Sequence, residues 1–247
     1  MAPTLDTQSR SHTKTSASSA VILFLFFATA RPTGQTPQSP GIVPAQEAVA
    51  IKNEPHHHLK FENSFVRVWD AMIPAGDATK FHVHAKDNVL ISLSDAHVRV
   101  ETVGSAPSES TPKAGDVSFR KAPYVHRVVN VGESAYHNIA VELLKRPFVK
   151  PTKEAEPENR NLVLENDSVR VFRISLDPAQ STGIQSNLPP ALIVNLAEAQ
   201  IEVETPDKQT EVKSFQPGDV QFRIGLLRQS LKNVGNTRFE AMEIQFK

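Results

Sequence analysis

The sequence repeats itself once, and this repeat limits the fold more than any other feature. Residues 61–68 (FENSFVRV) return at 164–171 (LENDSVRV), 103 positions later. The same register, without a gap, relates residues 61–144 to residues 164–247. A long period with only two copies indicates tandem domains rather than a solenoid of short units. The chain is therefore a duplication of one unit.

Each copy carries the pattern of a β-domain. Apolar residues such as Val66, Val68, Val89 and Ile91 recur at every second position, in short runs bounded by Gly, Pro, Asn and Asp. Such runs indicate strands, and no amphipathic helix of three turns interrupts them. We predict an all-β chain of two tandem jelly-roll barrels. The predicted domains cover 56–144 and 164–247, and a charged, proline-rich linker covers 145–163.

The N-terminal residues differ from both copies. Residues 1–30 contain basic residues, an apolar run at 20–28 and a small-x-small pattern (Ala-Thr-Ala) at its end, which predict a cleaved signal peptide. Nine helical residues reach only about 14 Å, against roughly 30 Å for a bilayer core. We therefore expect no stable membrane span and a periplasmic or secreted protein, with an uncleaved tether as the rival. Residues 31–55, rich in Pro and Gln, are expected to be a flexible leader.

The composition excludes several classes of function. Lys and Arg number 27, as do Asp and Glu, so the chain lacks the positive field that nucleic-acid binding needs. Cysteine is absent, which excludes disulfides, thiolate catalysis and cysteine-ligated zinc. Histidine and carboxylates are the strong metal ligands that remain. The partners considered are a small-molecule ligand and a second copy of the chain in a homo-oligomer.

Three histidines of the first copy form a candidate metal site. His82 and His84 are two positions apart, and on a strand such residues project from the same face. If that face lines the barrel, their imidazoles converge. His126 lies further along, where a neighbouring strand can bring it in as a third ligand. The alternative is a pair of histidines on a wet strand.

These residues resemble the motifs of the cupin superfamily, G-x5-H-x-H-x3,4-E-x6-G and G-x5-P-x-G-x2-H-x3-N. Gly76, His82 and His84 match the first motif in residue and spacing, and Gly115, His126 and Asn130 match the second. The resemblance covers both copies. It implies two double-stranded β-helix barrels, a bicupin, and one divalent transition metal such as iron, manganese, nickel, copper or zinc.

The first copy departs from the cupin pattern at one ligand. The position of the motif glutamate, four residues after His84, holds Asn88, with Asp87 beside it. Asp87, Asn88 and Tyr124 are therefore candidates for an additional ligand or for side chains that support the ligands. Tyr124 can also donate a proton, or merely pack at the barrel rim. Three neutral imidazoles leave the charge of the metal uncompensated, which favours an anionic substrate or hydroxide.

The second copy has lost this set. At the equivalent positions it carries Gln185, Asn187 and Gln229, whose amides are poor ligands for transition metals. We expect no metal there and a degenerate cupin domain. The three amides can instead hydrogen-bond one another, or a polar ligand, in the barrel mouth.

The remaining histidines are expected to have ordinary roles. The adjacent His56, His57 and His58 are expected to be solvated or to pack, the alternative being that one covers the barrel mouth as a lid or auxiliary ligand. His97 is expected to be exposed. His137 is expected to be a partly buried core residue, the alternative being a group that supports the metal site.

Two functions of different class follow. The first is a metal-dependent enzyme, dioxygenase-like or isomerase-like, that acts on a small oxygenated molecule and holds its metal through His82, His84 and His126. The second is a non-catalytic periplasmic module that binds a small molecule or a metal. The barrel does not choose between them, because the same fold serves both purposes.

Overall fold

The computed structural model describes residues 41–146, 159–207, 209–225 and 227–247, which belong to one compact unit, Ser39–Lys247. The predicted signal peptide and the first part of the predicted leader lie outside the described residues. Within the described chain, no helix has the length and apolar character required to cross a bilayer.

The described chain is built almost wholly from strands, with one short 3-10 helix, η1 (Ile51–Asn53). The first copy contains β1 (Val49–Ala50), β2 (His57–Glu62), β3 (Val66–Ile73), β4 (His82–His84), β5 (Asn88–Ser92), β6 (Val98–Thr102), β7 (Ser108–Ser110), β8 (Val117–Arg120), β9 (Tyr124–Asn130) and β10 (Tyr136–Leu143). The second copy contains β11 (Arg160–Glu165), β12 (Val169–Leu176), β13 (Gln185–Leu188), β14 (Ala191–Asn195), β15 (Ala199–Glu204), β16 (Thr210–Phe215), β17 (Val220–Arg223), β18 (Leu227–Asn233) and β19 (Phe239–Phe246).

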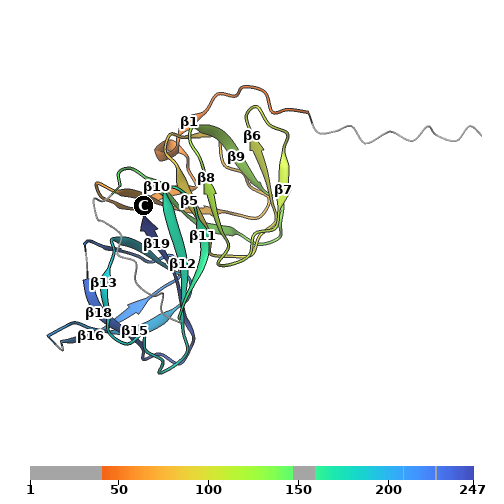
Figure 1. Cartoon of the computed structure of the whole chain (residues 1–247). Coiled ribbons are helices and arrows are strands. Elements are labelled where there is room, and N and C mark those ends of the chain that lie inside the picture. The colour runs from red at the N-terminus through yellow and green to blue at the C-terminus, as the bar shows by residue number, and fades with distance from the viewer. Residues whose placement is uncertain (1–40, 147–158, 208, 226) are drawn as a thin grey trace, which may run out of the picture. The chain divides into compact units, whose positions relative to one another are not determined.

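Each copy folds into two sheets, which confirms the all-β prediction (Figure 1). In the first copy the orders are β1-β4-β9-β6-β7 and β2-β3-β10-β5-β8; in the second they are β13-β18-β15-β16 and β11-β12-β19-β14-β17. Apart from the consecutive pairs β2-β3, β6-β7, β11-β12 and β15-β16, neighbours in these orders are not consecutive in sequence, as in a jelly roll. The strands also keep the sequence register: β12 and β19 begin 103 residues after β3 and β10.

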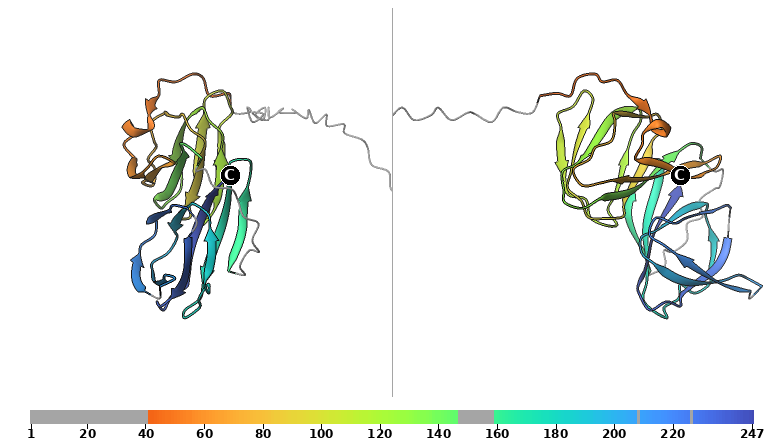
Figure 2. Two further views of the ribbon diagram at one scale, coloured as in Figure 1. Left: turned by 60° about the vertical axis from the view of Figure 1, so that its left-hand side comes forward. Right: turned by 180° about the vertical axis from the view of Figure 1, so that it is seen from behind.

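One apolar core is shared by both copies. The sheet that contains β3, β10 and β5 has one face toward its own barrel interior, and its other face packs into this core together with the equivalent sheet of the second copy; Figure 2 shows both sheets from two further sides. The fully buried members fall into pairs at equivalent positions: Val66 and Val169, Val68 and Val171, Val89 and Leu192, Ile91 and Val194, Ile139 and Met242, Val141 and Ile244. The duplication is therefore visible in packing as well as in sequence.

Two structural devices recur in both copies. Gly115 and Gly218 have φ of 84° and 85°, a conformation that favours glycine, and each is followed by an Asp that accepts a backbone N–H at 2.8 Å. Asn130 donates through Nδ2 to two carbonyls at 2.9 and 2.8 Å and accepts the N–H of Gly132 at 3.1 Å. Asn233 makes the same three bonds at 2.9, 2.7 and 3.0 Å. These motif residues therefore brace turns.

The predicted flexible leader, 31–55, is wrong for its last part. Val49 and Ala50 form β1, which pairs in parallel with β4, and Ile51 is buried against Trp69 and Ala140. Val43 is buried as well, and its N–H bonds the carbonyl of Ser105. Burial of these apolar side chains outweighs the turn-rich composition that suggested flexibility.

The predicted linker, 145–163, also ends too late. Strand β11 begins at Arg160 and pairs with β12, so residues 160–163 belong to the second barrel. They are the counterpart of the start of β2, where the repeat is too weak in sequence to be recognised. Residues 147–158 of the predicted linker lie outside the described chain.

Candidate metal centre

The three predicted histidines meet on two neighbouring strands. His82 and His84 stand two positions apart on β4, so both side chains project from the same face. Strand β9 pairs antiparallel with β4, and the register places His126 directly opposite His82. The sequence thus builds the cluster with one alternating strand and one cross-strand pair.

The spacing of the three rings fits one metal ion. Nε2 of His82 and Nε2 of His126 are 3.1 Å apart, and one nitrogen of each ring lies within 4.8 Å of the others. Metal–nitrogen bonds of about 2.0–2.1 Å put two imidazole nitrogens on one ion roughly 3 Å apart. The Nδ1 atom of His82 donates to the carbonyl of Lys80 at 2.9 Å, which orients the ring and leaves Nε2 with its lone pair.

Burial keeps these rings in the form that binds metals. His82 and His84 are 0% and 3% exposed, and His126 is 8% exposed. Desolvation, assisted by the neighbouring His57, lowers the pKa of His82 to about 4. Desolvation and His82 lower the pKa of His84 to about 2, and the same causes hold the pKa of His126 well below its usual value. All three are neutral near pH 7, and neutral imidazole is the ligand form.

Asn88 and Tyr124 support the cluster. The amide nitrogen of Asn88 donates to the hydroxyl of Tyr124 at 2.7 Å and lies 3.3 Å from Nδ1 of His84. The ring of Tyr124 stacks on His84, with centroids 4.8 Å apart. Burial raises the pKa of Tyr124, so its phenol keeps its proton near pH 7. These contacts orient His84 and hold a weak acid beside it.

Asp87 does not join the site, and its candidacy as a ligand is wrong. Its Oδ1 accepts the backbone N–H of Ala122 at 2.8 Å, and it lines a separate depression with Lys86 and Pro123. Neighbouring residues at the start of a strand point to opposite sides, so the chain turns Asn88 toward the histidines and Asp87 away.

His57 also belongs to the site, although the sequence alone left its role open. Its ring centroid lies 4.7 Å from that of His82, and its Nδ1 lies 2.6 Å from Oε2 of Glu54. Glu54 is 2% exposed and also accepts the N–H groups of His56 and Lys80. Burial alone raises the pKa of Glu54, but His57 and these N–H groups outweigh it and lower the pKa.

The other histidines lie outside the cluster. His58 is exposed, and His56 contacts the carbonyl of Met72 at 3.2 Å. His97 is exposed as predicted and pairs with a surface glutamate. His137 is half-buried, with Nε2 2.7 Å from Oδ1 of Asp70, on the face of β10 opposite to the residues that line the cavity. His137 therefore fits the prediction of a partly buried core residue better than that of a group that supports the metal site.

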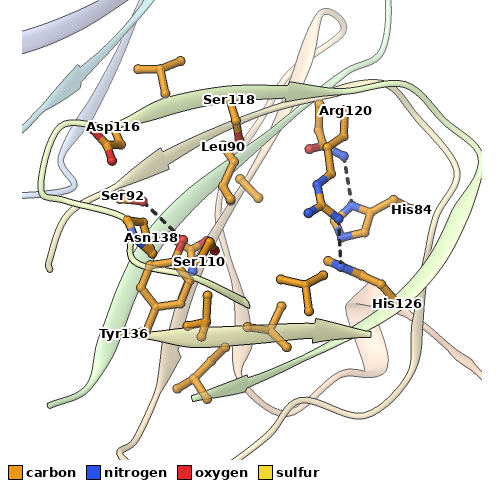
Figure 3. A pocket seen from close by; sticks show the side chains of 18 of the residues that line it. His84, Leu90, Ser92, Ser110, Asp116, Ser118, Arg120, His126, Tyr136 and Asn138 are labelled. Carbon is orange, nitrogen blue, oxygen red and sulfur yellow. Dashed lines mark hydrogen bonds between the residues drawn. The ribbon is translucent and has the colours of Figure 1, made fainter. Parts of the chain in front are cut away.

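An open cavity of about 490 Å³ adjoins the histidines. Figure 3 shows His84 and His126 at one side of it, with Arg120 pointing toward them, and Ser92, Tyr136 and Asn138 at the other side. Cavities of this volume are typical of small-molecule sites. The residues between the two polar ends are mainly apolar, among them Ile73, Val98, Val100 and Val128.

Arg120 was missed as a site residue. It is the last residue of β8, and its Nη1 lies 3.4 Å from Nδ1 of His126, while its guanidinium carbon lies 5.6 Å from the centre of the Tyr124 ring. Within the described residues it forms no ion pair. The signal in the sequence was the return of Phe119-Arg120 as Phe222-Arg223 in the second copy.

The second barrel has a different interior. Its cavity is only about 80 Å³, and the buried Glu243 lies in its wall, 2.7 Å from Arg160 and 2.9 Å from Arg223. Of the predicted trio of amides, Gln185 and Gln229 lie opposite each other on β13 and β18, whereas Asn187 is exposed. A register shift after Gln185 and a φ of 54° at Asn187 leave the Asn187 side chain exposed. The Nε2 of Gln185 is buried without a hydrogen-bond partner among the described residues.

Comparison with known proteins gives the fold. No protein-family model matches the sequence, and no curated protein matches it. Among solved structures, AerE from Microcystis aeruginosa is similar at a TM-score of 0.62 and 13% identity, covering 85% of this chain and 99% of AerE. A variant of oxalate decarboxylase from Bacillus subtilis has a TM-score of 0.54 and 10% identity, covering 85% and 79%. YhaK from Escherichia coli has a TM-score of 0.53 and 13% identity, covering 76% and 90%.

The chain has the fold of a bicupin, as its sequence motifs indicated. Its first barrel carries a group of three buried histidines that fits a metal-binding cupin.

Proposed function

We propose that the first barrel is a metal-dependent enzyme site that acts on a small oxygenated molecule. His82, His84 and His126 would hold one divalent transition metal. The observation that supports this most is the meeting of three buried, neutral imidazoles at the edge of a cavity of about 490 Å³. A purely structural cluster has no need of an open cavity beside it, whereas a catalytic metal keeps open positions for substrate.

The three imidazole donors are suited to first-row transition metals. Three imidazoles suit iron, nickel, copper and zinc, and manganese where oxygen ligands complete the site. When bound, such an ion supplies Lewis acidity or a coordination position for an oxygen ligand. Dioxygenase-like and isomerase-like reactions both use such a position.

The surrounding residues suit proton control and orientation. Tyr124 keeps its phenolic proton beside His84 and can deliver it to a bound oxygen atom, while Asn88 fixes its hydroxyl at 2.7 Å. His57 is held by Glu54 beside His82. Val98, Val100 and Val128 add apolar side chains to the cavity wall.

Metal analysis tests the proposal directly. The chain is purified without chelators, reconstituted with Mn²⁺, Fe²⁺, Ni²⁺, Cu²⁺ or Zn²⁺ singly, and analysed for bound metal. We expect about one ion per chain. A His82→Gln/His84→Asn variant, which carries the residues of the second copy, should bind none. His97→Gln, at an exposed histidine, is the matched control and should bind as the parent does.

The outcome also decides between the two classes of function. No metal in the parent after reconstitution would refute the metalloenzyme. Bound metal with turnover of no substrate, in an oxygen-uptake assay and an isomerisation assay with small hydroxy and keto compounds, would favour the non-catalytic binding module.

We further propose that the protein is exported. The apolar run at 20–28 and the Ala-Thr-Ala that ends it support cleavage after Ala30. Expression in a Gram-negative host, fractionation and N-terminal sequencing test this: a periplasmic chain that begins at Arg31 is expected, and an uncleaved chain in the membrane fraction would contradict it.

A further inference from the structure

Arg120 and Arg223 occupy equivalent places in the two barrels. Each is the last residue of its strand, β8 or β17, and the two are 103 positions apart. In the second barrel, Nη2 of Arg223 donates to Oε1 of Glu243 at 2.9 Å, and Nη1 lies 3.4 Å from Oε2. This is the two-pronged geometry in which a guanidinium binds a carboxylate. The second barrel therefore contains a built-in carboxylate for its arginine.

The first barrel has the arginine without the carboxylate. The position equivalent to Glu243 is Ala140, which lines the large cavity. The next inward-facing residue of β10, Glu142, accepts instead from Trp69 at 3.1 Å and from Arg67 at 3.3 Å. Asp116, a carboxylate in the cavity wall, accepts the N–H of Lys113 in its turn. Within the described residues, no carboxylate pairs with Arg120.

The cavity volumes agree with this difference. A glutamate and two arginines occupy the wall of the second cavity, of about 80 Å³, whereas alanine borders the first, of about 490 Å³. Arg120 is half-buried at the cavity wall. A guanidinium that is partly withdrawn from water without a counter-ion is unfavourable, and proteins pair such charges or leave them for a ligand. The space beside Ala140 is where a ligand carboxylate would take the place that Glu243 holds in the other barrel.

The histidine cluster strengthens the preference for an anion. An imidazole ligand carries no negative charge, so three of them do not offset the charge of a bound cation. When His126 offers Nε2 to a metal, its Nδ1 carries the ring proton and no longer accepts from Arg120. The guanidinium is then left facing the cavity with all its donors available.

The other residues that line the cavity indicate the chemical character of the remainder of the ligand. Beyond Arg120 the wall is apolar at Val98, Val100 and Val128, and it ends in a polar group formed by Ser92, Tyr136 and Asn138. The hydroxyls of Ser92 and Tyr136 are 3.2 Å apart, and Figure 3 shows them across the cavity from Arg120. A compact carboxylic acid with an apolar body and a polar far end matches this order.

We propose that the ligand of the first barrel is a small organic carboxylate and that Arg120 is the residue that binds its carboxyl group. This inference names the substrate class of the proposed metal site and in that sense rests on the proposed function. The guanidinium would bind the carboxylate in two-pronged fashion, in the arrangement that Arg223 and Glu243 already display.

The test uses carboxylates and their uncharged analogues. Acetate, butyrate, benzoate and 4-hydroxybenzoate are each paired with the corresponding amide, and binding is measured by thermal shift and calorimetry on the full chain, metal-free and zinc-loaded. At least one carboxylate should bind more tightly than its amide. Arg120→Gln should weaken that carboxylate about 10- to 100-fold and leave the amide unchanged, since hydrogen bonds to charged groups are the strong ones.

Four further variants control for folding and for general charge. Ala140→Glu should supply the missing carboxylate, abolish the carboxylate preference and raise the melting temperature, and this gain should vanish in Ala140→Glu/Arg120→Gln. Arg127→Gln removes an arginine that pairs with Glu101 at 2.8 Å and does not line the cavity, so it should bind as the parent does. If Ala140→Glu does not fold, Arg120→Lys, which keeps the charge but loses the fork, should show an intermediate loss.

The inference is overturned if no carboxylate is preferred over its amide, or if the preference is the same in Arg120→Gln. Its failure can be told from failure of the proposed function, because metal content is measured separately. Metal without a carboxylate preference refutes this inference alone. A carboxylate preference in a chain that binds no metal refutes the metal site alone.

Discussion

The two barrels share their strands and differ in what fills them. Strand for strand they keep the 103-residue register, yet the first encloses a cavity of about 490 Å³ and the second one of about 80 Å³. The first interior offers three neutral histidines and an arginine that has no counter-ion among the residues that the structure describes. The second offers a buried ion cluster of Glu243 with Arg160 and Arg223. One scaffold thus supports an open site and a closed interior.

Comparison of equivalent positions in the two barrels distinguishes residues that support the fold from residues that form the site. Asn130 and Asn233 make identical hydrogen bonds, so they belong to the scaffold, although the cupin motif includes this asparagine. His82, His126 and Ala140 change between the copies, and all three lie at or beside the cavity or the histidine cluster. A contact kept in both barrels is therefore structural, whereas a residue or a contact that differs between them is a candidate for function. Arg120 belongs to the second group, because its counterpart Arg223 pairs with Glu243 and Arg120 has no carboxylate partner among the described residues.

The largest effect is expected from the ion cluster of the second barrel. Glu243→Gln leaves two buried arginines without their carboxylate and should lower the free energy of unfolding by about 3–5 kcal/mol. Arg120→Gln in the first barrel removes a cation that has no such partner and should change it by less than about 1 kcal/mol. Urea unfolding of both variants measures the difference. Equal losses would contradict the assignment of Arg120 as a ligand-binding rather than a structural charge.

The pH dependence of stability should also differ between the barrels. The pKa of His82 is about 4 in the folded chain and about 6.5 unfolded, so the unfolded chain binds more protons as the pH falls from 6.5 to 4. Between pH 6.5 and pH 4, this residue should lower the free energy of unfolding of the metal-free protein by about 1.4 kcal/mol per pH unit, with no further loss below pH 4.

For Glu243, the pH range over which stability is lost is lower. Burial alone raises its pKa, but Arg223 and Arg160 outweigh it and leave the pKa below 4.5, so its stabilisation is present above that pH and is lost as the pH falls through the folded value. Unfolding of the metal-free parent, His82→Gln and Glu243→Gln between pH 7 and 3 checks both windows. A His82→Gln variant with the pH profile of the parent would contradict the first.

The shared asparagines should behave alike. Asn130→Ala and Asn233→Ala each remove three hydrogen bonds of a buried side chain and should each lower the free energy of unfolding by about 3 kcal/mol. Metal content, measured per folded chain, should stay at the parent value in both. Loss of metal from Asn130→Ala alone would show that this residue serves the site as well as the turn.

A small effect is expected at Tyr124, whose counterpart in the second copy is Leu227. Tyr124→Phe removes the acceptor of the Asn88 bond and should lower the free energy of unfolding by about 1 kcal/mol, while metal binding persists. If Tyr124 transfers a proton, turnover falls and substrate affinity does not. Loss of metal in this variant would instead make the phenol a ligand.

The sequence predicted the fold and the centre of the site because both depend on local spacing. Alternation placed His82 and His84 on one face of a strand, and the duplication identified two equivalent barrels. His126 was found through motif spacing. Asp87 was wrong because a one-residue error in facing reverses a side chain, and nothing local fixed which of Asp87 and Asn88 pointed inward.

The residues that were missed depend on long-range pairing. His57 reaches His82 from β2, and Arg120 reaches His126 from β8, contacts that no local pattern encodes. A signal was nevertheless present in the repeat. Arg120 returns as Arg223, whereas Ala140 returns as Glu243. Both copies therefore have the arginine, but only the second has the glutamate at this position.

The core between the sheets explains why a barrel without the histidines is retained. Its members come from the same positions of both copies, so each copy offers the other an equivalent apolar patch, as the subunits of a two-fold symmetric dimer do. The tandem chain is in effect such a dimer made covalent. Its degenerate half acts as a permanent subunit: it keeps the apolar face of the working half out of water, and its own interior is free to diverge.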